Sequence, residues 1–372
     1  MNYKETIYFI AKCLTISSER SNKEAIQKQL QMNNVDWDSL VEVSTSHFVL
    51  PALYCNLQRS KLLHYLPKKL VNYMRYITNL NRERNKQIII QAKELNNLLL
   101  INNITPIFLK GTANILAGIY EDIAERMIGD IDFIFSKKDY PKAIKLLRGF
   151  NYSEVYKYDY HFPAEKHYRR LQKKNSIAAI EIHSEILEIA KYRKEFNYSF
   201  VEKDSQIINE VRLLSYANKL NLSIIANQIN DNGFYYKNIA LRNAYDVFLL
   251  SKKTNAKDAV NALDKLTNPL NCFLAASYDI FNEVNSLEYD KTKMTNRYLN
   301  IFKYQLNNPR STIIRHKVVR IYLFFRDRFN ILYKSVIYKE YRVWLFKRLT
   351  DTKWYKKIVR SSIKNSSIRS YF

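Results

Sequence analysis

Three short segments between residues 107 and 183 carry side chains that could act together on a phosphate group. They are Phe108-Leu109-Lys110-Gly111-Thr112, Gly129-Asp130-Ile131-Asp132-Phe133 and Ile180-Glu181-Ile182-His183. Residues two apart on a β-strand point to the same face, so Asp130 and Asp132 are expected side by side and facing solvent. Adjacent carboxylates repel unless a cation lies between them, and Mg²⁺ or Mn²⁺ prefers such oxygen ligands. The pair therefore predicts a divalent metal site.

Glu181 lies in the same alternating pattern, between Ile180 and Ile182. A neighbouring strand could bring this third carboxylate beside Asp130 and Asp132, despite the long sequence separation. Three carboxylates can hold two metal ions, and two metals about 3.5–4 Å apart stabilise both the attacking and the leaving oxygen of a phosphoryl displacement. We therefore expect Glu181 to lie within about 8 Å of both aspartates, close enough to share one metal cluster.

The first segment is expected to hold the phosphates. Residues 106–109 predict a short strand and residues 113–120 a helix, which makes Gly111-Thr112 the turn between them. A glycine lets the backbone approach a phosphate, Thr112 could cap the helix, and a helix N-terminus attracts anions. Lys110 or Arg126 could add a charged contact to a triphosphate, near Gly129. The alternative for Arg126 is a surface ion pair with Asp122 or Glu125.

Four of the five glycines fall within this region: Gly111, Gly118, Gly129 and Gly149. Glycine is scarce in this chain, so we expect these positions to have special backbone geometry.

The histidines near Glu181 leave two interpretations open. His183 shares the strand face of Glu181, so it could touch a metal or substrate, or it could only orient a carboxylate by hydrogen bonding. His161, His167, Arg169 and Arg170 are weaker candidates for substrate contact, and their alternative is a polar hairpin before the Glu181 strand.

At these residues the chain resembles the nucleotidyltransferase superfamily, and most closely a bacterial family of uncharacterised nucleotidyltransferases. The family pattern appears as Leu109-Lys110-Gly111, Arg126-Met127-Ile128-Gly129-Asp130-Ile131-Asp132 and Ile180-Glu181-Ile182-His183. The resemblance also covers Ser46-His47-Phe48-Val49-Leu50-Pro51-Ala52-Leu53-Tyr54 and reaches weakly to Tyr245-Asp246-Val247-Phe248-Leu249-Leu250. The chain departs from it at Ile225-Ala226-Asn227-Gln228, where the close family is expected to have a histidine, and at Thr112, where Ser or Gly is usual.

The resemblance implies a DNA polymerase β-like core that transfers a nucleoside monophosphate from an NTP, with ATP expected, to an acceptor and releases pyrophosphate. In that scheme Asp130, Asp132 and Glu181 are catalytic and hold Mg²⁺ or Mn²⁺. Lys110, Gly111, Thr112, Arg126 and Gly129 bind the nucleotide, and His183 gives possible support. Two alternatives are an Asp-x-Asp glycosyltransferase, which leaves the Gly-Thr turn and Glu181 unexplained, and a non-catalytic nucleic-acid-binding protein on this scaffold.

The 372 residues, 47% of them hydrophobic, can form a sizeable core. We expect an α+β or α/β fold in which a nucleotidyltransferase core with a small mixed sheet is flanked by helical N- and C-terminal regions. The predicted regions are a helical 1–100, an α/β core at 101–195, a helical domain at 196–300 and a basic, aromatic-rich helical region at 301–372.

Cysteine usage and hydropathy bear on location. Cys13, Cys55 and Cys272 lack metal or disulfide spacing, which predicts buried, reduced thiols. The chain has no run of 18 apolar residues and its start lacks the pattern of a signal peptide. We therefore expect a cytoplasmic protein with no transmembrane segment.

The C-terminal region holds much of the net charge of +25. From Arg310 to Phe372 there are 17 Lys and Arg residues against three acidic residues, a balance of 17 − 3 = +14. Aromatic residues lie among these basic residues, both around Phe324 and around Trp354. Such a segment could bind RNA or another polyanionic acceptor, or lie on an anionic membrane surface, or form a packed helix pair whose outer face is simply basic.

Overall fold

The computed structural model describes residues 1–155 and 160–352. The chain divides into two compact units. The larger unit comprises Met1–Tyr156 and Lys166–Asn307, and the smaller one comprises Lys157–Glu165 and Asn308–Phe372. The candidate carboxylates all belong to the larger unit.

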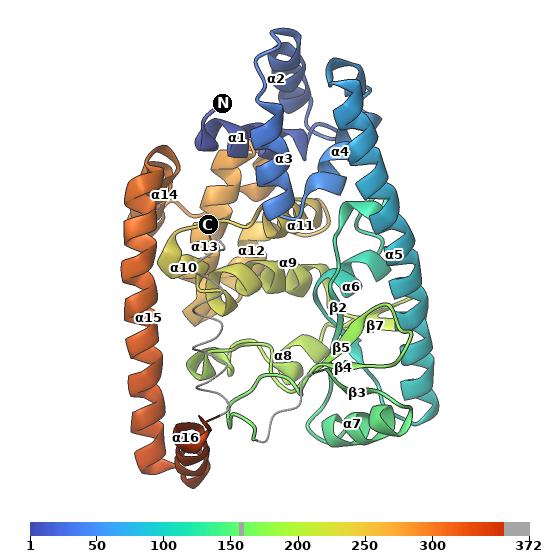
Figure 1. The fold of residues 1–372 in the computed structure, drawn as a ribbon, viewed down its shortest axis with the longest axis vertical. Coiled ribbons are helices and arrows are strands. Elements are labelled where there is room, and N and C mark those ends of the chain that lie inside the picture. Colours follow the sequence, from blue (N-terminus) through green and yellow to red (C-terminus); the bar gives the residue numbers. More distant parts are fainter. Residues whose placement is uncertain (156–159, 353–372) are drawn as a thin grey trace. The chain divides into compact units, whose positions relative to one another are not determined.

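The larger unit contains a seven-stranded mixed sheet with the strand order β3-β4-β5-β2-β1-β7-β6. The sheet lies beside α5, at the lower right of Figure 1. The strands are β1 Ile107–Phe108, β2 Asp130–Ile134, β3 Ser153–Glu154, β4 Leu171–Gln172, β5 Ala179–His183, β6 Gln206–Ile208 and β7 Val211–Leu213. The β2–β5 and β1–β7 pairs are parallel, and the other neighbours are antiparallel. The fold is thus α+β with one mixed sheet and flanking helices, as the sequence predicts.

Alternation of side chains along β2 and β5 decides which side chains take which face of the sheet. Ile131 and Phe133 are fully buried, as are Ile180 and Ile182, which fixes one apolar face. The carboxylates therefore must lie on the other face. Burial of the apolar face is what sets the register of the two strands.

Helices before the sheet make up the N-terminal part of the larger unit. They are α1 Tyr3–Cys13, α2 Arg20–Gln31, α3 Trp37–Ser46, α4 Leu50–Arg59 and α5 Lys68–Ile101. Helix α5, 34 residues long, packs against α4 and runs past the sheet (Figure 1). Gln91 on α5 exchanges two hydrogen bonds with the backbone of Ala178, just before β5. Asn85 donates to the backbone oxygens of Ile123 and Arg126 before β2. Helix α5 thereby holds the chain at the start of both carboxylate strands.

The remaining α-helices of the larger unit lie between and after the strands along the chain. They are α6 Lys110–Leu116, α7 Tyr140–Gly149, α8 Tyr198–Glu202, α9 Tyr216–Ile225, α10 Gly233–Tyr236, α11 Leu241–Ser251, α12 Ala256–Asn261, α13 Thr267–Ile280 and α14 Lys293–Asn307. Helix α9 continues into one π-helical turn, Ala226–Asn230, at the segment that departs from the family pattern. There Gln228 is buried and donates to the side chain of Asn227 and the backbone oxygen of Asn238.

The smaller unit contains the long helix α15, Pro309–Ile337, and α16, Lys339–Thr350. Arg342 on α16 donates to the backbone oxygens of Ser335 and Val336 and so fixes the bend between the two helices. In α15 only Thr312, Leu323 and Ser335 are buried among the described residues. Helices α15 and α16 pack against each other, and the exposed surface of α15 carries apolar side chains such as Ile314 and Phe329 as well as basic ones. The three interpretations of this region, as an RNA-binding segment, a membrane-binding segment or a packed basic helix pair, stay predictions. Lys353, Trp354 and the basic residues after them lie outside the described residues.

The expectation about the glycines is mostly wrong. Among the described glycines, only Gly118 has a positive φ (66°). At Gly129 and Gly149, an added methyl group would meet no described atom within 4 Å. The crowded glycine is instead Gly233, where a Cβ would lie 2.7 Å from the backbone oxygen of Asn227. Gly233 is needed because the π-helical turn passes so close to it.

The three cysteines are buried and free, as predicted. Burial raises the pKa of the Cys55 thiol to about 12, which makes it unreactive. Among the residues that the structure describes, no helix is both long and apolar enough to cross a membrane.

Candidate metal and nucleotide site

Strand pairing brings the carboxylates together. On the parallel strands β2 and β5, Asp132 pairs in register with Glu181, and Asp130 lies two residues before Asp132 on the same face. The ligand atoms of Asp132, Glu181 and His183 all lie within 4.8 Å of one another. The Glu181 carboxylate is therefore beside that of Asp132, as the alternating pattern predicts.

Asp130 and Asp132 differ in exposure. The Asp130 side chain is 22% exposed, but that of Asp132 is only 8% exposed. The expectation that both face solvent is therefore wrong for Asp132. The difference arises because Asp132 lies deeper along β2, between Lys110 and His183.

Two basic side chains compensate the three carboxylates. The Lys110 ammonium lies 2.6 Å from Asp132 Oδ1 and 3.5 Å from Glu181 Oε2. Arg170 Nη2 bonds to Asp130 Oδ2 at 2.8 Å and to Glu181 Oε1 at 3.0 Å. Each cation thus bridges two carboxylates. A divalent ion would compete for the same oxygens.

The electrostatics of the site follow from burial and these cations. Burial raises the pKa of Asp130, and Arg170 only partly offsets that effect. Burial also acts to raise the pKa of Glu181, but the hydrogen bond from His183 and the charge of Lys110 outweigh it and lower this pKa. Glu181 is therefore held ionised. For Lys110, burial opposes the charged form, but Asp132 and Glu181 raise its pKa, so it stays protonated.

His183 is buried and its Nε2 lies 2.9 Å from Asp132 Oδ1. Its Nδ1 lies 3.4 Å from the backbone oxygen of Glu185. The ring is thus held from both nitrogens, an arrangement that suits the orientation of a carboxylate. Because its Nε2 also belongs to the cluster of possible ligand atoms, direct metal contact is compatible with the geometry.

The predicted phosphate turn has a different local structure from the one expected. Helix α6 begins at Lys110, whose φ of 52° is left-handed, so the sharp turn falls there and not at Gly111. Thr112 is buried inside the helix and does not cap it. Its hydroxyl donates to the backbone oxygen of Asp130 at 3.1 Å. Thr112 therefore ties α6 to β2, which fixes Lys110 beside the carboxylates.

Gly111 lies against the side chain of Arg126. A Cβ on Gly111 would lie 3.4 Å from Ile128 Cγ1 and 3.5 Å from the Arg126 guanidinium carbon, which is ordinary contact. Gly129 continues directly into β2, and its backbone oxygen accepts from Arg84 at 3.1 Å. Nucleotide binding by Gly111 or Gly129 stays a prediction.

Arg126 forms a buried ion pair that the sequence does not suggest. Its Nε lies 3.0 Å from Asp246 Oδ2 on α11, and Tyr120 donates to Asp246 Oδ1 at 2.6 Å. The expected surface pairs with Asp122 or Glu125 are wrong, because those carboxylates pair with Arg82 and Arg59 instead. The weak resemblance around Asp246 was the one sequence signal that could have indicated this contact.

The four weaker candidates separate in the structure. Only Arg170 bonds to the carboxylates. His167 packs edge-on against the His183 ring, with 5.2 Å between the ring centres. Arg169 instead pairs with Glu154 at 2.8 Å. His161 belongs to the smaller unit and lies 3.6 Å from Glu165.

A change of register explains how Arg170 reaches the site. His167 is bridged to His183, whereas Leu171 pairs with Ile180. Between these two pairings the chain advances four residues from His167 to Leu171 but only three from Ile180 to His183. The segment before β4 therefore contains one extra residue, which is a β-bulge. Bulges re-aim side chains, and no feature of the local sequence predicts this one.

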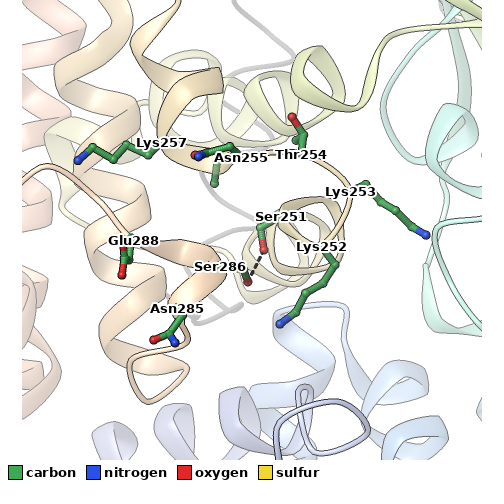
Figure 2. Close-up of a pocket in the computed structure, with 10 residues that line it drawn as sticks. Ser251, Lys252, Lys253, Thr254, Asn255, Lys257, Asn285, Ser286 and Glu288 are labelled. Carbon is green, nitrogen blue, oxygen red and sulfur yellow. Dashed lines mark hydrogen bonds between the residues drawn. The ribbon is translucent and has the colours of Figure 1, made fainter.

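A cavity of about 310 Å³ lies elsewhere, beside the α11–α12 connection (Figure 2). Two of the three lysines that line it are paired, Lys252 with Glu19 and Lys257 with Asp290. The hydroxyls of Ser251 and Ser286 are hydrogen bonded to each other at 2.8 Å across it. It shares no residue with the carboxylate cluster.

The pattern of a protein family described as uncharacterised nucleotidyltransferase matches residues 33–280, two thirds of the chain. The matched segment contains every residue of the carboxylate cluster. No curated protein matches the chain. The crystal structure of JHP933 from Helicobacter pylori is similar at 13% identity and a TM-score of 0.28, covering 65% of this chain and 97% of that one.

Proposed function

Because this chain belongs to the uncharacterised nucleotidyltransferase family, we propose that it is a metal-dependent enzyme that moves an NMP group from an NTP to an acceptor hydroxyl. The observation that carries the proposal is the cluster of Asp132, Glu181 and His183 ligand atoms within 4.8 Å, inside the segment that matches the family. The donor is proposed to be ATP.

The carboxylates suit a hard divalent cation such as Mg²⁺ or Mn²⁺. Asp130, Asp132 and Glu181 supply oxygen ligands, and the charges of Lys110 and Arg170 show that the cluster needs cationic compensation. When bound, the metal supplies electrostatic stabilisation of the oxygens around the reacting phosphorus. His183 orients Asp132 through their 2.9 Å contact.

In the proposed reaction, the acceptor oxygen attacks the α-phosphorus and the bond from that phosphorus to the bridging oxygen of pyrophosphate breaks. Glu181 is the group proposed to help to activate the acceptor hydroxyl. Lys110 and Arg170 lie where they can turn from the carboxylates to the triphosphate once another cation neutralises the cluster. Their multiple N–H donors and full charge suit phosphate oxygens. Arg170 thus joins Lys110 as a proposed nucleotide contact.

Two other functions are compatible with the sequence motifs. An Asp-x-Asp glycosyltransferase has no need of Glu181, which is placed in register with Asp132. A non-catalytic nucleic-acid-binding scaffold has no need of a carboxylate set buried with its own compensating cations. Nucleotidyl transfer is the function of the three that accounts for all three carboxylates.

RNA or another polyanion bound by the basic C-terminal region is one possible acceptor. The described part of that region exposes aliphatic side chains that RNA recognition does not use. We therefore keep the acceptor as a hydroxyl-bearing molecule and assign the C-terminal helices a different partner below.

The test is transfer of label from each α-³²P-labelled NTP in the presence of Mg²⁺ or Mn²⁺. Candidate acceptors are RNA, protein and small molecules, and the protein itself is included. Labelled product that forms with wild type and is lost on chelation supports the proposal. Absence of NTP binding by calorimetry, with either metal present, would contradict it irrespective of which acceptor is correct.

A further inference from the structure

Helix α15 carries an exposed apolar row that nothing in the proposed reaction uses. Six residues recur at steps of three and four, and we call them the α15 stripe: Ile314, Val318, Ile321, Phe325, Phe329 and Leu332. This spacing places them on one side of the helix. Their exposed fractions run from 50% for Leu332 to 66% for Phe329. A contiguous exposed apolar surface of this kind marks an interaction site.

Helix α15 is also strongly basic. Helix α15 contains seven Lys and Arg residues and one acidic residue, Asp327, which Arg326 pairs at 2.7 Å. Lys317 and Arg328 are exposed and lie along one edge of the stripe. The occupant of this surface must therefore combine an apolar layer with negative charge above it.

Neither RNA nor a second copy of the chain fits this description. RNA offers phosphates and base faces, which suit the aromatic residues but gain little from Ile314, Val318 or Ile321. Two stripes packed together would bring basic edges against each other, and like charges repel. The surface of an anionic bilayer offers both features, because acyl chains lie directly below charged headgroups.

We propose that α15 binds the surface of membranes that contain anionic phospholipid, with the α15 stripe entering the headgroup–acyl boundary and the flanking lysines and arginines contacting lipid phosphates. The helix lies on the surface and does not cross it, in agreement with its many charges. At 1.5 Å per residue its 29 residues extend about 44 Å. This inference is independent of the nucleotidyltransferase proposal.

The experiment is sedimentation of the full chain with vesicles of phosphatidylcholine alone or mixed with phosphatidylserine, without nucleotide or metal. Binding is expected to the mixed vesicles and to weaken with salt. Ile321→Gln with Phe325→Gln should weaken it about tenfold or more, as should Lys317→Gln with Arg328→Gln. The charge variant should also show a smaller dependence on salt.

The matched control is Ile313→Gln with Phe324→Gln, one aliphatic and one aromatic residue that are 43% and 52% exposed but lie off the stripe. This control should keep vesicle binding within about twofold of wild type. Circular dichroism and thermal melting establish that each variant folds.

Three outcomes would overturn the proposal. The first is no binding to mixed vesicles. The second is RNA binding, measured by gel shift, that depends on the stripe while vesicle binding does not. The third is a concentration-dependent dimer, measured by light scattering, that the Ile321→Gln/Phe325→Gln variant abolishes, because the stripe would then be covered by a second copy of the chain and not by lipid.

Discussion

Asp132 on β2 and Glu181 on β5 are register partners across a parallel strand pair, and Lys110 lies against both carboxylates. The ammonium group of Lys110 therefore compensates the charges of two carboxylates that are far apart in sequence. Removal of any one of the three residues changes the charge seen by the other two.

Asp130→Asn or Asp132→Asn should lower nucleotidyl transfer by roughly a hundredfold or more, as expected when a major electrostatic stabiliser is lost. The amide keeps the shape of the side chain but loses its charge. Label transfer and thermal melting measure the two effects. Asp139→Asn is the control, because Asp139 lies before α7 and bonds Ser136 outside the cluster. Full activity in either variant would refute the metal-site assignment.

Lys110→Met should destabilise the metal-free protein by about 1–3 kcal/mol, because Asp132 and Glu181 lose a charged hydrogen-bond donor. The uncompensated carboxylates should then attract a cation more strongly. Addition of Mn²⁺ should therefore raise the melting temperature of this variant more than that of wild type. Lys142→Met, at an exposed lysine paired with Asp139, is the control. An equal response to Mn²⁺ in both proteins would show that no metal binds at these oxygens.

Asp246→Asn should reduce the free energy of unfolding by about 3–5 kcal/mol, because it leaves Arg126 buried without its counter-charge. Chemical denaturation measures this value. Asp122→Asn breaks a more exposed pair with Arg82 and should cost about 0–1 kcal/mol. If Asp246→Asn leaves stability intact and alters only the KM for nucleotide, Arg126 is a ligand-binding residue and not a structural one.

Gly233→Ala should destabilise the protein by about 1–3 kcal/mol, since the added Cβ would lie 2.7 Å from the backbone oxygen of Asn227. Gly149→Ala is the matched control and should change stability by less than about 0.5 kcal/mol, because no described atom lies within 4 Å of the new Cβ. Equal unfolding free energies for the two variants would mean that the π-helical turn can relax without cost.

His47 should make stability depend on pH. Its Nδ1 accepts a hydrogen bond from the Leu241 backbone at 3.2 Å, and burial lowers its pKa to about 4. The folded state thus binds this proton less readily than the unfolded state, whose pKa is about 6.5. The contribution of neutral His47 to the free energy of unfolding is therefore complete above about pH 6.5, and it is lost as the pH falls towards 4.

His47→Gln should flatten the pH dependence of the unfolding free energy within this window, by up to about 3 kcal/mol. Urea denaturation of wild type and His47→Gln between about pH 4 and 6.5 gives the difference between their unfolding free energies at each pH. Taking this difference cancels the contributions of the other titrating groups. A slope unchanged by His47→Gln would mean that the imidazole titrates alike in both states.

The sequence by itself determined the elements that carry the chemistry. Alternation of Ile131 and Phe133 with Asp130 and Asp132 fixes which side chains share a strand face, because a strand has a period of two residues. The same rule places Glu181 on the face opposite its flanking isoleucines. These are local properties, so they can be read without knowing the fold.

Only the tertiary structure decided which charges meet. Lys110 faces Asp132 because Thr112 fastens α6 to β2, Arg170 reaches Glu181 because of a bulge, and Arg126 pairs with Asp246 across 120 residues. The exposure of the α15 stripe likewise depends on which side chains of its own unit cover the helix. Such contacts depend on packing between distant segments, and local sequence periodicity contains no information about it.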